Sequence, residues 1–140
     1  MRLVNRSGYD TADLKAFMTK AFKAYRVDPR GIEVIVVSAP KRSRGCASVG
    51  ATTCSGGRCR TSQGRRIVLA TAPPSYNPTY ASWLRRFSQL VRHECAHLRG
   101  LEHEDMAHDL LYSLGPTPPW ARDAKIRYRG RAPNQMKGLG

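Results

Sequence analysis

Apolar residues recur every three or four positions in two stretches of the chain, and this spacing predicts two helices. The first covers residues 11–27, where one apolar stripe is formed by Leu14, Phe17, Met18, Ala21, Phe22 and Tyr25. Asp10 or Thr11 can cap its start, because their side-chain oxygens accept hydrogen bonds from the first backbone N–H groups. The turn-forming residues 28–31 end this helix.

The second predicted helix covers residues 79–99 and is the longest element. Asn77 and Pro78 mark its start, and Gly100 marks its end because glycine adopts the left-handed backbone conformation at low cost. Its buried side is expected to carry Trp83, Phe87, Leu90, Val91 and Leu98. A shorter helix is predicted over residues 104–114.

Short runs rich in β-branched residues predict strands at residues 32–38 and 66–71. A weaker strand is expected within residues 46–53, and residues 55–58 are typical of a turn. With the helices, these strands indicate a small α+β domain. It would contain an N-terminal helix, a mixed sheet of about three strands, the long helix and a short C-terminal helix.

The chain of 140 residues has the length of a single domain. We place that domain in residues 1–119 and expect residues 120–140 to form a basic, flexible tail. No apolar run approaches the roughly 20 residues of a membrane span, and the N-terminus lacks the apolar stretch of a secretory signal. We therefore expect a cytoplasmic protein.

The most informative segment of the chain lies at the end of the long helix, where His93, Glu94 and His97 form an HExxH pattern. Residues four apart lie on one helix face, so both imidazoles can bind one zinc ion. Glu94 is displaced by about 100° around the helix axis. From there its carboxylate can accept a proton from a water molecule at the metal.

A catalytic zinc ion needs a third protein ligand and an open fourth position. Gly100 permits a reversal of the chain after His97, and His103 can then return to the metal. Four other nearby side chains are alternative third ligands: Glu102, Glu104, Asp105 and His108. A later glutamate ligand fits the sequence less well, because Asp123 is the only acidic residue after Asp109.

The full pattern from His93 to His103, HExxHxxGxxH, resembles that of the metzincin clan of zincin metallopeptidases. The resemblance implies that His93, His97 and His103 bind one zinc ion and that Glu94 is the general base. It also implies a peptide or protein substrate, aligned along an edge strand that we assign to residues 66–71. A methionine turn beneath the metal would be supplied by Met106.

The same segment resembles a second family, the bacterial rRNA-maturation endoribonucleases, which also carry three histidines with a glycine before the third. That resemblance implies a zinc-dependent endoribonuclease as an alternative function. A third hypothesis is a nucleic-acid-binding protein with a structural zinc, in which a cysteine or an aspartate completes a closed site of four ligands. Glu94, directly after the first histidine, favours the peptidase.

Charge makes an anionic partner a further expectation, since 24 basic residues oppose 10 acidic ones and give a net charge of +14. Residues 41–66 carry seven basic side chains and no acidic one. Residues 121–140 carry six basic side chains and one acidic one. Four arginines of this second segment are candidate nucleic-acid contacts: Arg122, Arg127, Arg129 and Arg131.

The four cysteines show no CxxC pair, which argues against a zinc ribbon. Cys54 and Cys59 either close the loop between them as a disulfide or remain thiols, and the sequence assigns no role to Cys46. Cys95 lies inside the long helix, away from the face that carries the two histidines. We expect it to be a buried thiol rather than a metal ligand.

Overall fold

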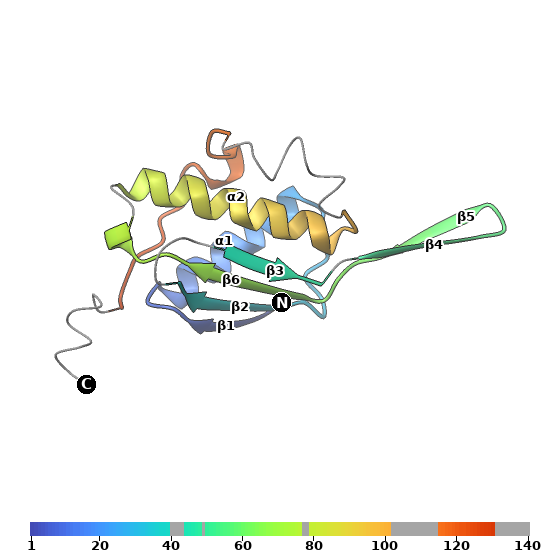
Figure 1. Ribbon diagram of the computed structural model, residues 1–140, viewed down its shortest axis with the longest axis horizontal. Helices are drawn as coiled ribbons and strands as arrows, with labels where there is room; N and C mark the ends of the chain where they lie inside the picture. The colour runs from blue at the N-terminus through green and yellow to red at the C-terminus, as the bar shows by residue number, and fades with distance from the viewer. Residues whose placement is uncertain (40–43, 49, 77–78, 102–114, 131–140) are drawn as a thin grey trace.

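Four strands form one mixed sheet in the order β1-β2-β6-β3 (Figure 1). The computed structural model describes residues 1–39, 44–48, 50–76, 79–101 and 115–130. Within them, β1 (Arg2–Arg6), β2 (Glu33–Ser38) and β6 (Arg66–Thr71) are parallel neighbours. The fourth strand, β3 (Arg44–Ala47), runs antiparallel to β6 at the edge of the sheet. The α+β class is therefore confirmed, with a four-stranded sheet in place of the expected three.

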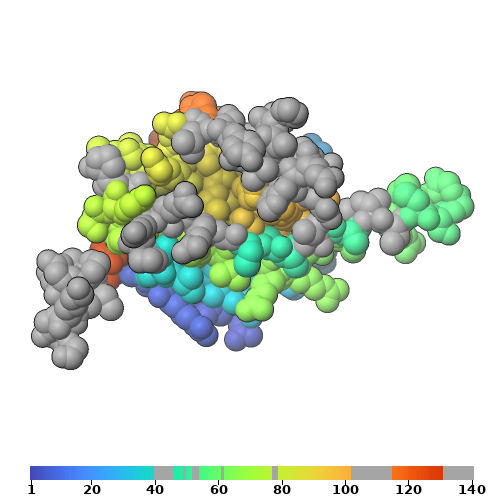
Figure 2. All heavy atoms as spheres, in the orientation of Figure 1, coloured from blue at the N-terminus to red at the C-terminus, as the bar shows by residue number. Residues whose placement is uncertain are grey.

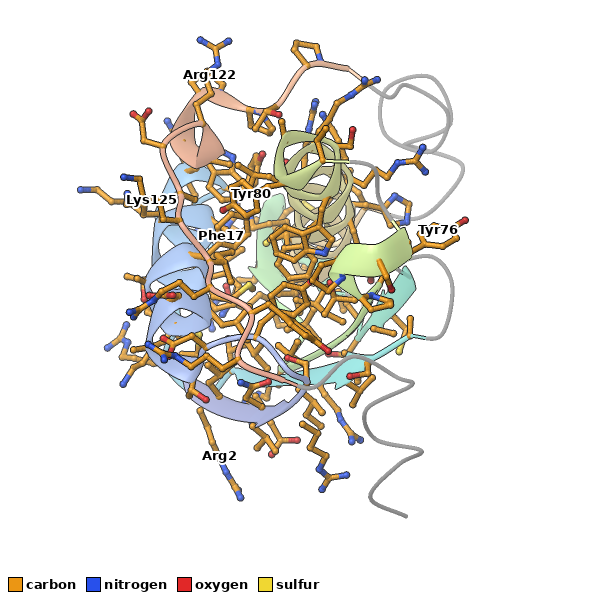
Figure 3. The ribbon with its side chains drawn as sticks, turned by 90° about the vertical axis from the view of Figure 1, so that its left-hand side faces the viewer. Arg2, Phe17, Tyr76, Tyr80, Arg122 and Lys125 are labelled. Carbon is orange, nitrogen blue, oxygen red and sulfur yellow. A yellow bond between two sulfur atoms is a disulfide. The ribbon has the colours of Figure 1, made fainter. Side chains whose placement is uncertain are left out.

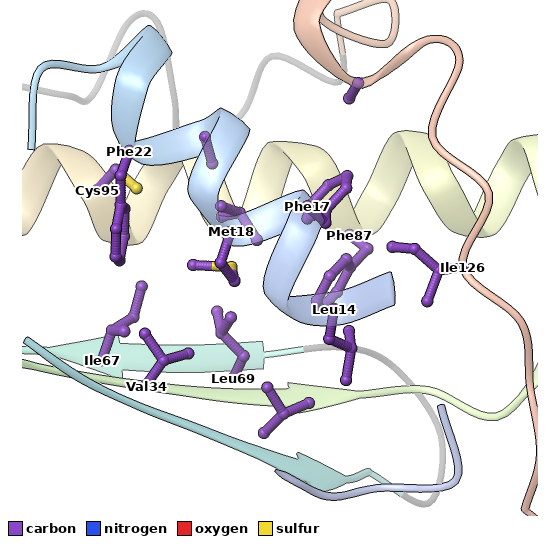
Figure 4. Close-up of a cluster of buried hydrophobic side chains, with 14 of the residues drawn as sticks. Leu14, Phe17, Met18, Phe22, Val34, Ile67, Leu69, Phe87, Cys95 and Ile126 are labelled. Atoms are coloured by element: carbon purple, nitrogen blue, oxygen red, sulfur yellow. The ribbon is translucent and has the colours of Figure 1, made fainter. Parts of the chain in front are cut away.

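Both long helices cover the same face of this sheet (Figure 4). Helix α1 (Thr11–Ala24) connects β1 to β2, and helix α2 (Tyr80–Leu98) follows β6 after the short 3-10 helix η1 (Pro74–Tyr76). Alternate strand residues point at the helices and are fully buried: Val34, Val36, Ile67 and Leu69. They meet the predicted stripe of α1, of which Leu14, Phe17, Met18, Ala21 and Phe22 are buried. These contacts form the hydrophobic core.

The helix starts follow from side-chain caps. The Asp10 carboxylate accepts a hydrogen bond from the backbone N–H of Asp13 at 3.0 Å, which confirms the predicted start of α1. Thr79 caps α2 in the same way, accepting from the backbone N–H of Ser82 at 3.0 Å. Asn77, the cap expected from the sequence, lies outside the described residues.

A two-stranded hairpin, β4 (Ala51–Ser55) and β5 (Arg58–Ser62), stands apart from the sheet. We call it the arm, because it projects clear of the body of the molecule (Figures 1 and 2). Gly56 and Gly57 form its turn with φ values of 57° and 77°, a conformation that favours glycine. Cys54 and Cys59 are paired directly across the two strands and joined by a disulfide, which resolves the alternative left open by the sequence.

The position of β6 differs from the expectation that residues 66–71 form an edge strand. β6 is hydrogen-bonded to β2 on one side and to β3 on the other, so its backbone cannot pair with a further strand. Its apolar sequence fits this central place, since Ile67 and Leu69 are completely buried. The edge strand beside α2 is instead β3. It lies in the polar segment between the two strands predicted at residues 32–38 and 66–71.

Residues 115–130 pack against both α1 and α2, in contrast to the flexible tail expected from residue 120 onward (Figure 3). This segment contains the 3-10 helix η2 (Pro119–Ala121), and it buries Ala121 and Ile126 to 0% and 5% exposure. Apolar side chains alternate here with basic ones, so burying the former orders the backbone while the charges stay in solvent. Residues 131–140 lie outside the described residues.

The aromatic anchor of this segment is Trp120. Its ring lies 4.9 Å from that of Phe17 and 5.6 Å from that of Tyr25, measured between centroids. Its indole N–H donates a 2.6 Å hydrogen bond to the Tyr25 hydroxyl.

Among the described residues, no helix is long and apolar enough to span a membrane.

Replacing this anchor tests whether the C-terminal segment belongs to the folded domain. Trp120→Ala is expected to lower the free energy of unfolding by about 2 kcal/mol, because it removes a half-buried ring and its hydrogen bond. Chemical denaturation followed by circular dichroism measures the change. Tyr76→Ala is the matched control, since that ring is 45% exposed, and it should leave stability almost unchanged. Equal stability of the two variants would show that the segment is not part of the core.

Candidate metal centre

The last two turns of α2 bring two of the predicted ligands together. The ring centroids of His93 and His97 are 4.8 Å apart, and the rings are nearly perpendicular, at 83°. His97 is 8% exposed, and His93 is half-buried. This separation allows each ring to give one nitrogen to the same zinc ion, to which imidazole bonds are about 2.0–2.1 Å long. The two histidines therefore fit half of a zinc site.

The orientation of His97 is fixed by the backbone. Its Nδ1 lies 2.8 Å from the carbonyl oxygen of Leu101. A carbonyl only accepts hydrogen bonds, so Nδ1 carries a proton, and in the neutral ring Nε2 carries the lone pair. Metal-binding histidines in general hold their second nitrogen in this way, which sets the tautomer and the ring orientation. His97 is therefore in the form that binds a metal ion through Nε2.

Gly100 produces this contact by the way it ends the helix. Its φ of 98° reverses the chain, the Gly100 N–H bonds to the His97 carbonyl at 2.9 Å, and the Leu101 N–H bonds to the Ala96 carbonyl at 3.0 Å. This is the Schellman pattern of hydrogen bonds at a helix end. The reversal carries the Leu101 carbonyl back to the histidine. The glycine of the HExxHxxG pattern thus confirms its predicted role in turning the chain.

Glu94 is the one buried carboxyl group of the described core. It is 2% exposed, and no described residue donates a hydrogen bond to its Oε2 atom. Burial alone raises its pKa to about 7. A buried carboxyl oxygen without a partner is costly, and such groups occur where a site needs a proton donor or acceptor.

Cys95 lies on the core side of α2, as expected from the sequence, among side chains that include Phe22 and Ile67 (Figure 4). It is completely buried, and burial together with the neighbouring charge of Glu94 raises its pKa to about 12. A thiol that stays protonated is a poor metal ligand.

The remaining predicted ligands are not on the described part of the chain. His103, the alternatives Glu102, Glu104, Asp105 and His108, and the expected methionine-turn residue Met106 all lie outside it. Within the described residues, no group of three or more histidine, cysteine, aspartate or glutamate side chains is placed to hold a metal ion. The third ligand therefore stays a prediction from the sequence.

The candidate anion-binding arginines of the C-terminal segment have different surroundings. Arg127 pairs with Asp13 at 2.9 Å, and Arg129 pairs with Asp10. The pKa of Asp13 is lowered chiefly by the Arg127 side chain, and that of Asp10 by the Asp13 backbone N–H and then by Arg129. Arg122 is exposed and donates to the Thr117 carbonyl, while Arg131 lies outside the described residues. Two of the four arginines thus help to hold the C-terminal segment against the start of α1.

Two features of the site escaped sequence reasoning. The first is the Leu101 carbonyl, because a backbone atom leaves no residue-specific signal. The second is a pair of glycines, Gly50 and Gly64, whose N–H groups donate at 2.9 Å to the carbonyls of His97 and Leu98. The sequence shows that these two glycines flank a basic hairpin, but it contains no signal that they contact the end of α2.

The buried carboxyl group gives the metal-free protein a distinctive pH dependence. The pKa of Glu94 in the folded protein, about 7, lies above its ordinary value of 4.5, so the fold favours the protonated form. Below pH 4.5 the carboxyl group is protonated in both the folded and the unfolded chain, so its burial adds no pH dependence. As the pH rises to 7 and above, the free energy of unfolding falls by about 3 kcal/mol, because the unfolded chain releases the proton more readily. Glu94→Gln should remove this loss, making the chelator-treated variant more stable than wild type at pH 8.

Denaturation at pH 5 and pH 8 measures this difference. Glu33→Gln is the control, because Glu33 lies at the sheet surface between Arg2 and Arg66 and its side chain is 34% exposed. If Glu94→Gln follows the wild-type profile between the two pH values, the carboxyl group is not buried in solution.

A scan against protein-family models and searches of curated proteins and of solved structures found no match to this chain. What the site can do follows from its own residues. Two imidazoles share one helix face, a carbonyl fixes the second of them, and a buried carboxyl group follows the first in sequence.

Proposed function

We propose that this protein is a zinc-dependent metallopeptidase. The observation that carries the proposal is the Glu94 carboxyl group, buried to 2% exposure with one oxygen unpaired among the described residues. A carboxyl group with only a structural role would be paired or exposed, because an unpaired buried oxygen costs stability. Its place directly after His93 is where a hydrolytic zinc site needs a general base.

The residues present fit a zinc ion. His93 and His97 would bind it, His97 through Nε2, and His103 would be the third ligand proposed from the sequence. Three neutral imidazoles would leave the full charge of the ion available to polarise a substrate carbonyl group and to make a water molecule more acidic. Imidazole is a ligand that zinc prefers.

Glu94 supplies the proton transfers of peptide hydrolysis. Its carboxylate accepts a proton from the attacking water, whose oxygen bonds to the carbonyl carbon of the substrate. The carboxylic acid then donates that proton to the departing amine nitrogen as the C–N bond breaks. A pKa near neutrality suits a group that must take up and release the same proton, and the burial of Glu94 acts in that direction.

The substrate surface that we propose is the edge strand β3. It packs beside α2, and its outer edge pairs with no other strand of the described sheet. An extended peptide can add to such an edge through backbone hydrogen bonds. This assignment replaces the strand at residues 66–71, whose backbone is paired on both sides.

The mechanism is tested by removing the base while keeping the ligands. Glu94→Gln is expected to bind zinc as the wild type does and to cleave a peptide library at least about 100-fold more slowly. His97→Ala should lose both zinc and activity. Metal content is measured by elemental analysis and cleavage by mass spectrometry, with Glu33→Gln as the matched carboxylate control.

Three results would contradict the mechanism. Undiminished peptide cleavage by Glu94→Gln would exclude Glu94 as the base. Cleavage of RNA but not of peptides, with loss of activity on chelation, would assign the site to the endoribonuclease alternative. Unfolding of the chain on chelation, without hydrolysis of either substrate, would indicate a structural zinc.

The turn at Gly100 gives a second, independent prediction. Gly100→Ala strains the left-handed turn and displaces the Leu101 carbonyl from His97, so zinc affinity should fall about 10- to 100-fold. Gly57→Ala is the matched control, because Gly57 also has a positive φ but lies at the tip of the arm. Competition with a chromophoric chelator measures both affinities, and equal values for the two variants would show that the carbonyl does not orient the ligand.

A further inference from the structure

We propose that the arm, β4 with β5, binds duplex DNA by entering its major groove with Arg58 and Arg60. The proposal concerns a surface separate from the metal centre, and it holds whether or not the protein is a peptidase. It rests on the charge that the arm exposes, on the shape of the hairpin and on the way its base is fixed to the body.

The arm carries positive charge that no part of the described protein neutralises. Arg58 and Arg60 are exposed, and neither makes an ion pair with a described residue. The arm lies within residues 41–66, where the sequence has seven basic residues and no acidic one. By contrast, Arg127 and Arg129 of the C-terminal segment are paired with aspartates. A polyanion is the partner that this exposed charge attracts.

One face of the hairpin carries the arginines, and the other face carries the disulfide that stiffens it. Strand residues two apart share a face, so Arg58 and Arg60 lie together on one face, where Arg58 is paired across the hairpin with Ser55. Cys54 and Cys59 occupy the other face, where the disulfide joins the strands without covering the arginines. An isolated two-stranded hairpin is only marginally stable, so this cross-link keeps the arginine face in one shape.

The size of the arm fits one groove. Five-residue strands are about 17 Å long, and two strands lie about 4.8 Å apart. The major groove of B-form DNA, about 12 Å wide, admits a two-stranded ribbon of this kind. The major groove of duplex RNA is too deep and narrow for it. The shape of the arm therefore favours DNA over RNA.

The composition of the arm argues against other partners. Residues 51–62 include five serines and threonines besides the two arginines, and no aromatic residue. Binding of single strands relies on bases stacking on aromatic rings, and protein interfaces rely on buried aromatic or large apolar anchors. Arginine and hydroxyl side chains with exposed backbone are the groups that contact DNA phosphates and base edges.

The base of the arm is rigidly attached to the body at three points. The Gly50 and Gly64 N–H groups bond to the last carbonyls of α2, and the Ser48 hydroxyl accepts from the N–H groups of Arg65 and Arg66 at 2.7 and 2.9 Å. A Cβ atom on Gly50 would lie 2.6 Å from the Leu98 carbonyl oxygen, so the backbones approach as closely as glycine allows. The arm therefore leaves the body in a fixed direction.

Fluorescence anisotropy with a labelled 20-base-pair duplex tests the proposal, using the full chain with Glu94→Gln so that hydrolysis does not interfere. Arg58→Ala with Arg60→Ala should weaken binding roughly tenfold or more at physiological salt. It should also reduce the slope of log K against log salt by up to about 2, one for each of the two arginines that contacts a phosphate at the groove. The control is Lys15→Ala with Lys20→Ala, which removes two charges from the exposed face of α1 and should change affinity much less.

Competing ligands decide between duplex DNA and other polyanions. Single-stranded DNA, duplex RNA and polyglutamate of matched charge are expected to compete weakly. Equal competition by any of them, or equal loss of affinity in the arm and control variants, would overturn the proposal. Circular dichroism and zinc content establish that each variant is folded.

The cross-link provides a separate readout. Cys54→Ser with Cys59→Ser leaves both arginines in place but releases the two strands, so duplex affinity should fall with an unchanged salt slope. Unchanged affinity would contradict the role assigned to a stiff ribbon, since the charges alone would then account for binding.

Discussion

The structure depends on close backbone contacts at the last turn of α2. The carbonyls of His97 and Leu98 accept hydrogen bonds from Gly50 and Gly64 at the base of the arm, and Gly100 turns the chain away from the helix beside them. A side chain at Gly50 would hold the arm away from the helix end, because its Cβ would lie 2.9 Å from the Gly100 nitrogen. The three glycines thus let a helix end, an arm and a ligand-orienting turn share one place.

These contacts explain why His97, a candidate ligand, is well oriented although it lies near a helix end, where helices tend to fray. The His97 carbonyl accepts from both Gly50 and Gly100, and its ring donates to the Leu101 carbonyl. Backbone and side chain of the same residue are held from opposite directions. The sheet contributes indirectly, since the arm leaves it through β3 and returns through β6. This framework sustains the buried Glu94, whose Oε2 accepts no hydrogen bond from a described residue, because packing elsewhere offsets its cost.

The sequence predicted those parts of the fold that depend on local periodicity and caps. Both helices, Asp10 as the first cap and the strand at residues 66–71 were found because apolar spacing and turn residues are local signals. Strand β1 was missed because RLVNR alternates weakly and carries arginines at both ends. The order of strands was also missed, since pairing between β3 and β6 joins segments about twenty residues apart. The shared helix face of His93 and His97 could be predicted from their spacing, whereas the carbonyl that contacts His97 could not.

The surplus of positive charge divides into two parts that composition alone does not separate. One part is used internally: Arg127 and Arg129 meet the aspartates at the start of α1 and help to hold a segment whose apolar residues pack on that helix. The other part stands on the arm, where the described residues provide no counter-charge for Arg58 and Arg60. A chain selected only for solubility has no need to concentrate arginine on a cross-linked projection without acidic neighbours. Because the base of that projection is hydrogen-bonded to the end of the helix that carries His93, Glu94 and His97, a partner that binds the arm lies on the same side of the protein as the candidate metal centre.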